Sequence, residues 1–67
     1  MAARRYRIEV AGPLPGGLAE ELPHMTVRTT DASTTLTGAM ADAAALYGLI
    51  SRLEGLGLVL LSLQPDP

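Results

Sequence analysis

The clearest pattern in the chain is the spacing of apolar residues between positions 40 and 57. On a helical wheel, the larger aliphatic side chains of this stretch share one arc of about 100°, as in a helix that lies on a core; they are Leu46, Leu49, Ile50 and Leu53. Asp42 can accept a hydrogen bond from a first-turn amide, and Gly57 suits the left-handed residue that follows a helix. The sequence therefore predicts a helix over about residues 43–56, with Leu58 folding back on its end.

Three other segments alternate apolar and polar residues with a period of two, the pattern of strands covered on one face. They run over residues 5–10, 25–30 and 34–38, and the polar link Asp31-Ala32 predicts a hairpin between the last two. We expect one face to be covered, with Tyr6, Ile8, Val10, Met25, Val27, Thr29, Thr34, Leu36 and Gly38. The opposite face then carries Arg5, Arg7, Glu9, Thr26, Arg28, Thr30, Thr35 and Thr37.

The segment LVLLSL at residues 58–63 breaks this alternation, because it is apolar on both faces. One face is expected to carry Leu58, Leu60 and Ser62, and the other Val59, Leu61 and Leu63. A single helix can cover only one of these faces. The second face is therefore predicted to need a neighbouring surface.

The order of these elements predicts an α+β domain. Before the hairpin, GPLPGG at residues 12–17 is a turn, and LAEEL at residues 18–22 allows at most a turn or two of helix. A strand, a short link, a hairpin, a long helix and a last strand make the ferredoxin-like βαββαβ plan, with a short or degenerate first helix. We expect an antiparallel-rich four-stranded sheet with the long helix on one face. A meander of three strands followed by helix and strand is the alternative, because the first link does not settle the crossover.

Length and composition narrow the possible functions. The 67 residues predict a single small domain over residues 1–67, with an ordered core over about residues 5–64. The absence of cysteine excludes disulfides and thiolate nucleophiles, and the single histidine argues against structural zinc. Hydrophobic residues make up 48% of the chain and charged residues 18%, against roughly 25% charged in typical domains. This balance favours burial against a partner subunit. We also expect no cofactor, no metal and no catalytic residues in this chain.

The charge pattern disfavours nucleic-acid and membrane partners. The net charge is −2, and the sheet face away from the helix carries no aromatic side chain on which a base could stack. The N-terminus MAARRYRIEV lacks the apolar run of a signal peptide, and LGLVLLSL falls far short of the ~20 residues that span a bilayer. We therefore expect a cytoplasmic protein.

The motifs RIEVAG, TTLTG and DAAALYGLISRLEGLGLVLLSL resemble a family of short, stand-alone actinobacterial proteins with no assigned activity. The resemblance covers roughly residues 6–63. The relatives read close to D-Q-A-A-L-H-G-L-L-x-R-I-R-D-L-G-L-P-L-L-S, and this chain departs from them at Ala43, Tyr47 and Val59. The resemblance implies a free-standing domain. Tyr47 stands where relatives carry histidine, so the resemblance does not transfer an acid-base role of that histidine to this chain.

The chain offers few groups for catalysis. His24 is expected in a surface loop or at a ligand, and the adjacent Glu20 and Glu21 diverge by about 100° on a helical turn and are expected to be solvated. Tyr6 and Tyr47 are expected to pack in the core with their hydroxyls at the rim, or to mark a small pocket between helix and sheet.

Arg7 and Arg28 project from the same predicted face, with threonine hydroxyls beside them. They are candidates for recognition of an anion, with Tyr47 as a further candidate for ligand recognition. The alternative is a cross-strand ion pair between Glu9 and Arg28, worth a few tenths of a kcal/mol when exposed.

Self-association is the leading functional hypothesis. Val59, Leu61 and Leu63 are the predicted interface, and the small residues Ala44, Gly48 and Ser51 form a second possible contact track on the helix. We expect a non-enzymatic homodimeric module that binds a protein partner or a small effector. The alternative is a small dimeric α+β enzyme or ligand-binding protein with an apolar pocket between helix and sheet, in which Tyr47, His24 or Glu54 would act as acid or base.

Overall fold

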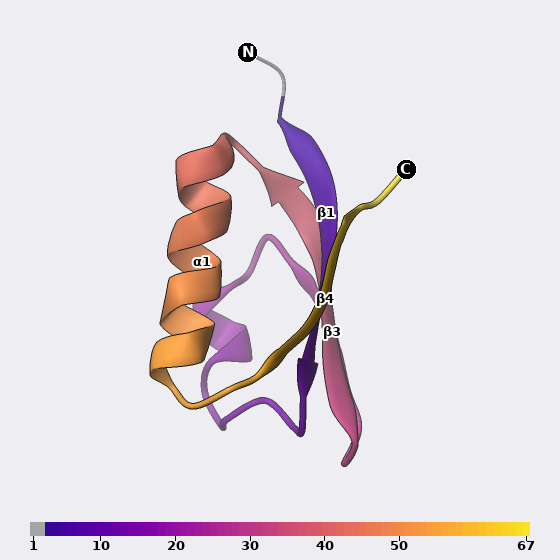
Figure 1. Cartoon of the computed structure of the whole chain (residues 1–67), viewed down its shortest axis with the longest axis vertical. Coiled ribbons are helices and arrows are strands. Elements are labelled where there is room, and N and C mark those ends of the chain that lie inside the picture. The colour runs from indigo at the N-terminus through magenta and orange to yellow at the C-terminus, as the bar shows by residue number, and fades with distance from the viewer. Residues whose placement is uncertain (1–2) are drawn as a thin grey trace.

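The computed structural model describes residues 3–67 and consists of a four-stranded antiparallel sheet with one α-helix on one face (Figure 1). The elements in chain order are β1 (Arg4–Ala11), the 3-10 turn η1 (Ala19–Glu21), β2 (Thr26–Thr29), β3 (Ser33–Met40), α1 (Ala43–Gly55) and β4 (Leu60–Pro65). The strand order in the sheet is β2-β3-β1-β4, and α1 connects β3 to β4. The predicted α+β class is confirmed. The meander alternative is wrong, because β3 lies between β1 and β2.

Helix α1 is capped at both ends by the residues that its sequence predicts. The Asp42 carboxylate accepts a hydrogen bond of 2.8 Å from the amide of Ala45. At the other end Gly57 has a φ of 87°, its amide donates to the Glu54 carbonyl, and the Leu58 amide donates to the Leu53 carbonyl. This pair of bonds is the Schellman motif, which satisfies carbonyls that the last turn leaves free. The helix ends at Gly55, one residue before the predicted end.

The core lies between α1 and the sheet. The buried hydrophobic residues are Ile8, Val10, Leu18, Leu22, Met25, Leu36, Met40, Leu46 and Leu53. Leu18, Leu22 and Met25 come from the link between β1 and β2, so this link lies on the same side of the sheet as the helix and completes the core. Tyr6 packs against the core as predicted.

The prediction that Tyr47 packs in the core is wrong. Its side chain is 65% exposed, whereas the neighbouring Leu46 is 5% exposed. Successive residues of a helix are rotated by about 100°, so Tyr47 lies beyond the arc that contacts the sheet when Leu46 and Leu53 occupy its centre.

A chain of hydroxyl groups ties the turn after β1 to the β2–β3 hairpin. The buried Thr34 hydroxyl donates to the Gly12 carbonyl at 2.9 Å. Because its one proton is used there, Thr34 accepts from the Thr29 hydroxyl 2.8 Å away, and Thr29 accepts from the amide of Leu14. The turn at residues 12–14 is thus held by polar contacts.

Strand β4 contains a bulge that changes the predicted faces of its residues. Leu60 pairs with Val10, Ser62 pairs with Glu9 and Leu63 pairs with Ile8, and the register shifts at Leu61. Directly opposed residues share a face of the sheet. Leu63 therefore lies on the helix side with Ile8, and Ser62 on the open side with Glu9. The strict alternation predicted from the sequence is wrong for these two residues, because the bulge inserts one extra residue.

Replacing Thr34 with valine should destabilise the fold by about 1–3 kcal/mol, because the Gly12 carbonyl and the Thr29 hydroxyl lose their buried partner. Urea denaturation followed by circular dichroism measures this loss. Thr35→Val is the matched control, since Thr35 lies on the open face, and its free energy of unfolding should change by less than about 0.5 kcal/mol. Equal losses in both variants would contradict the role assigned to Thr34.

Candidate functional site

The open face of the sheet, away from α1, carries polar and charged side chains in two rows. Pairing between strands places Arg7 beside Thr37 and Thr37 beside Thr26. The next row runs from Glu9 through Thr35 to Arg28. Arg7 and Arg28 therefore stand on the two strands that flank β3, with threonines between them.

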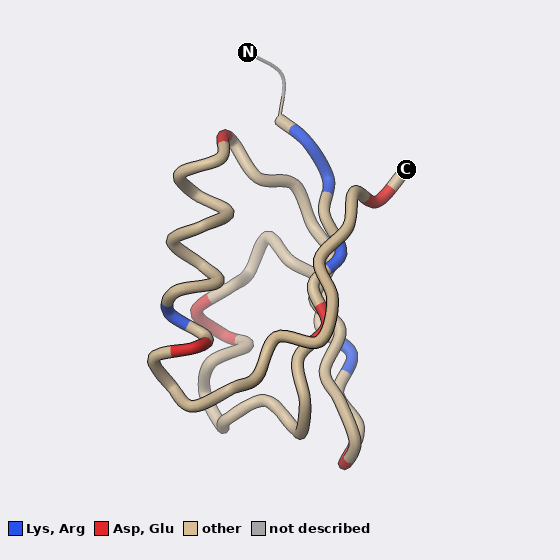
Figure 2. The backbone as a smooth tube through the Cα atoms, viewed as in Figure 1, with Lys and Arg blue, Asp and Glu red and all other residues tan. Residues whose placement is uncertain are grey.

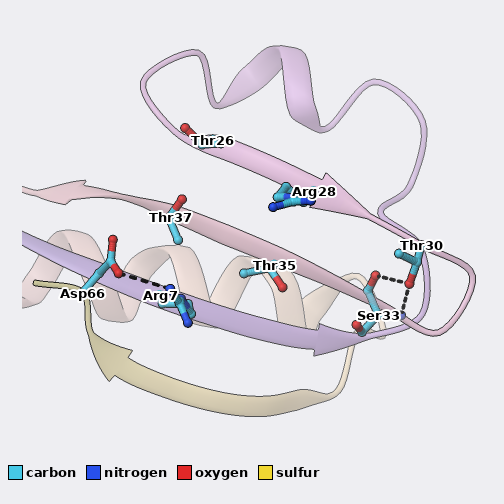
Figure 3. A pocket seen from close by; sticks show the side chains of 8 residues that line it. All are labelled: Arg7, Thr26, Arg28, Thr30, Ser33, Thr35, Thr37 and Asp66. Carbon is cyan, nitrogen blue, oxygen red and sulfur yellow. Dashed lines mark hydrogen bonds and ion pairs between the residues drawn. The ribbon is translucent and has the colours of Figure 1, made fainter.

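The side chains of these two rows, except that of Glu9, line a groove of about 590 Å³ (Figure 3). Its lining residues are Arg7, Thr26, Arg28, Thr30, Ser33, Thr35, Thr37 and Asp66. The structure thus brings together two of the candidate recognition residues, Arg7 and Arg28. The third candidate, Tyr47, is on α1 and does not line the groove.

Asp66 and Ser33 are groove residues that the sequence did not indicate as candidates, and Asp66 is the charged one of the two. The carboxylate of Asp66 lies 3.5 Å from the guanidinium of Arg7 and 3.6 Å from that of Arg5. Its amide donates to the Arg5 carbonyl at 2.9 Å, which continues the pairing of β4 with β1. The sequence held no signal for this contact, because it depends on the register that β4 adopts after its bulge.

Arg28 makes no ion pair with any of the residues 3–67. The predicted pair with Glu9 is wrong, because β3 separates the two strands that carry these residues. Glu9 instead accepts a hydrogen bond of 3.4 Å from the Ser33 hydroxyl. Basic positions lie along the sheet and an acidic one lies next to the C-terminus in Figure 2. The charged residues that line the groove are Arg7, Arg28 and Asp66.

A second depression, of about 340 Å³, lies beside α1. Its lining residues are Leu22, His24, Met40, Ala45, Gly48, Leu49 and Arg52. His24 is exposed, as predicted for a surface loop. Tyr47 does not line this depression. Within residues 3–67, no three acidic or histidine side chains are grouped so as to hold a metal ion.

The link and the helix are joined by an ion pair. Arg52 of α1 contacts the carboxylate of Glu21 in η1, while Glu20 is exposed, as predicted. Both partners of the ion pair are about half exposed, so its contribution to stability is limited to about 1 kcal/mol or less.

The predicted interface residues lie on and beside β4, which is an edge strand of the sheet. In the single chain Val59 is 61% exposed, Leu61 is 53% exposed and Leu63 is 37% exposed. The helix track of Ala44, Gly48 and Ser51 is also exposed. Apolar side chains thus gather at one edge of the sheet.

Residues 5–64 match the model of a family described as Domain of unknown function (DUF8691), and the chain belongs to that family. No curated protein and no solved structure matches the chain. In the part of the chain that the structure describes, no helix combines the length and apolar character needed to cross a membrane.

Replacing Arg28 with glutamine should leave the free energy of unfolding within about 0.5 kcal/mol of the parent value, because Arg28 holds no ion pair. Arg52→Gln is the comparison and should cost up to about 1 kcal/mol through the loss of Glu21 as partner. Thermal and urea denaturation of both variants make the measurement. A loss above about 1 kcal/mol for Arg28→Gln would assign this residue a structural role.

Proposed function

We propose that this chain is a non-enzymatic module that associates with a second copy of itself through β4 and recognises a protein partner or a small effector. The observation that carries the proposal is the run of exposed aliphatic side chains at a sheet edge, Val59, Leu61 and Leu63. An edge strand offers unpaired backbone groups as well as side chains, and both favour pairing with another strand.

The free energy available from burying the three aliphatic side chains is too small to account for a dimer by itself. Burial of ~30 Å² of apolar surface contributes roughly 0.8 kcal/mol, so three side chains contribute several kcal/mol. A dimer with micromolar affinity needs about 8 kcal/mol. Backbone pairing and the adjoining sheet surface therefore have to contribute the remainder of the binding free energy.

The geometry of β4 limits where such pairing can occur. The Asp66 amide donates to the Arg5 carbonyl on β1. Amide direction alternates along a strand, so the amides of residues 64 and 62 also point toward β1, and the Leu63 amide points away from it. Pro65 has no amide to donate and ends the edge available for pairing. Pairing is thus confined to about residues 59–63. A two-fold axis would set two such segments antiparallel and join the two sheets into one.

We also propose finer assignments for the fold and for the family. The strand order β2-β3-β1-β4, with every neighbouring pair antiparallel, supports a ferredoxin-like βαββαβ unit whose first helix is reduced to η1. The motifs RIEVAG, TTLTG and LGLVLLSL support an actinobacterial origin, and the absence of cysteine is compatible with a cytoplasmic location.

A ligand-binding protein or small enzyme is the second candidate function. The depression beside α1, lined by Leu22, Leu49 and Met40, favours an apolar ligand there. His24 also lines this depression, and its imidazole is the side chain most often used for proton transfer in catalysis. Saturable binding of aromatic or acyl compounds that His24→Gln abolishes would favour this candidate over the module.

Sedimentation equilibrium tests self-association directly. The parent chain should sediment as a dimer at tens of micromolar, and Leu61→Glu should sediment as a monomer because a charge would be buried without a partner. Circular dichroism should give the same folded spectrum for both proteins, since Leu61 is exposed in the single chain.

Leu56→Glu is the matched control for this experiment. Leu56 is 51% exposed, close to the 53% of Leu61, and lies at the C-terminal end of α1 rather than on β4. This variant should remain dimeric. A parent chain that is monomeric at micromolar concentration, or equal dissociation of both variants, would overturn the proposed interface.

A further inference from the structure

We infer that the groove on the open sheet face binds a small oxyanion, either a carboxylate or a phosphoryl group, with Arg28 as its main charged contact. This inference deepens the proposed function by naming the chemical class of the effector. The groove lies over β1, β2 and β3, whereas the proposed interface is the outer edge of β4. Binding in the groove and pairing at the edge can therefore be tested separately.

Charge is the first argument for an anion. The groove is lined by Arg7, Arg28 and Asp66, so positive charge exceeds negative by one. Asp66 pairs with Arg7, which leaves Arg28 as the arginine of the groove without a counter-ion among residues 3–67. Arginine presents a planar fork of N–H donors that fits carboxylate and phosphate oxygens in a bidentate manner.

The second argument is the supply of hydroxyl donors beside Arg28. Thr30 and Ser33 are already hydrogen-bonded within the hairpin turn. Thr26, Thr35 and Thr37 also line the groove (Figure 3), and their hydroxyls take part in none of the side-chain hydrogen bonds found within residues 3–67. Their hydroxyls are therefore available to a bound oxyanion, which would lie over β3 between the two arginines.

The carboxylate of Asp66 occupies one end of this groove. Its side chain is 17% exposed and lies between the guanidinium groups of Arg5 and Arg7, which are each about half exposed. An anion that binds beside it meets its negative charge and competes with it for Arg7. Removal of the Asp66 charge should therefore strengthen binding, an effect that a purely structural role of Asp66 would not produce.

The same face argues against a long polyanion. Glu9 lies in the same row as Arg28 and Thr35, so an extended anion would meet a carboxylate on β1. None of the groove-lining residues is aromatic, so bases would find no stacking surface. The site therefore fits a small ligand with one anionic group.

Isothermal titration calorimetry at constant ionic strength tests the inference, with inorganic phosphate and succinate as separate probes. At least one probe should bind saturably in the millimolar range or tighter. Arg28→Gln should weaken that binding about tenfold or more through loss of a charge-assisted contact. Asp66→Asn should strengthen it severalfold.

Arg4→Gln is the matched control, because Arg4 is on β1 with its partner Met40 on the covered side of the sheet and does not line the groove. It should leave affinity unchanged. Binding of phosphate alone assigns the site to phosphoryl groups, and binding of succinate alone assigns it to carboxylates. Absence of saturable binding for both probes, or equal weakening by Arg4→Gln and Arg28→Gln, would overturn the inference.

The Leu61→Glu variant separates this inference from the proposed self-association. The groove residues are all supplied by one chain, so the monomeric variant should bind the probe as well as the parent chain does. Loss of binding on monomerisation would contradict a groove that is complete in one copy. A parent chain that is monomeric yet binds the probe would overturn the interface and support the groove.

Discussion

The structure depends on how little of the sheet a single helix can cover. Helix α1 has 13 residues and is therefore about 20 Å long and about 10 Å wide with its side chains. Strands are spaced by about 4.8 Å, so the helix covers the width of about two strands. The remaining width needs other apolar groups, and the link between β1 and β2 supplies Leu18, Leu22 and Met25. Among residues 3–67 no strand pairs with the outer edge of β4, and the side chains of Val59, Leu61 and Leu63 stay exposed in the single chain.

The same constraint explains the composition of the two faces. Leu36 and Thr34 of β3 are fully buried beneath the helix and the link, while Thr35 and Thr37 of the same strand face the groove. Threonine suits an uncovered strand because its branched side chain favours the extended backbone and its hydroxyl remains hydrated. The open face is thus stable without a second layer, and Arg28 on this face has no ion-pair partner among residues 3–67.

Local sequence signals predicted the local structure well. The caps of α1 at Asp42 and Gly57, the faces of β1 and β3, and the β2–β3 hairpin follow from short-range backbone chemistry. Features that depend on contacts between distant segments were not predictable in this way. The bulge at Leu61 moves Leu63 to the helix side, and the exposure of Tyr47 depends on which part of α1 meets the sheet. The placement of Arg7 and Arg28 on one face was predicted from alternation, whereas the pairing of Asp66 with Arg7 needed the register of β4.

We propose that a second copy of the chain covers the outer edge of β4. Hydrogen exchange at the Leu63 amide, which points away from β1, tests it most directly when followed by nuclear magnetic resonance over a range of protein concentrations. Protection of this amide should increase with protein concentration, while the amide of Asp66, bonded to Arg5 within the chain, should keep the same protection throughout. An unprotected Leu63 amide at every concentration would contradict the claim.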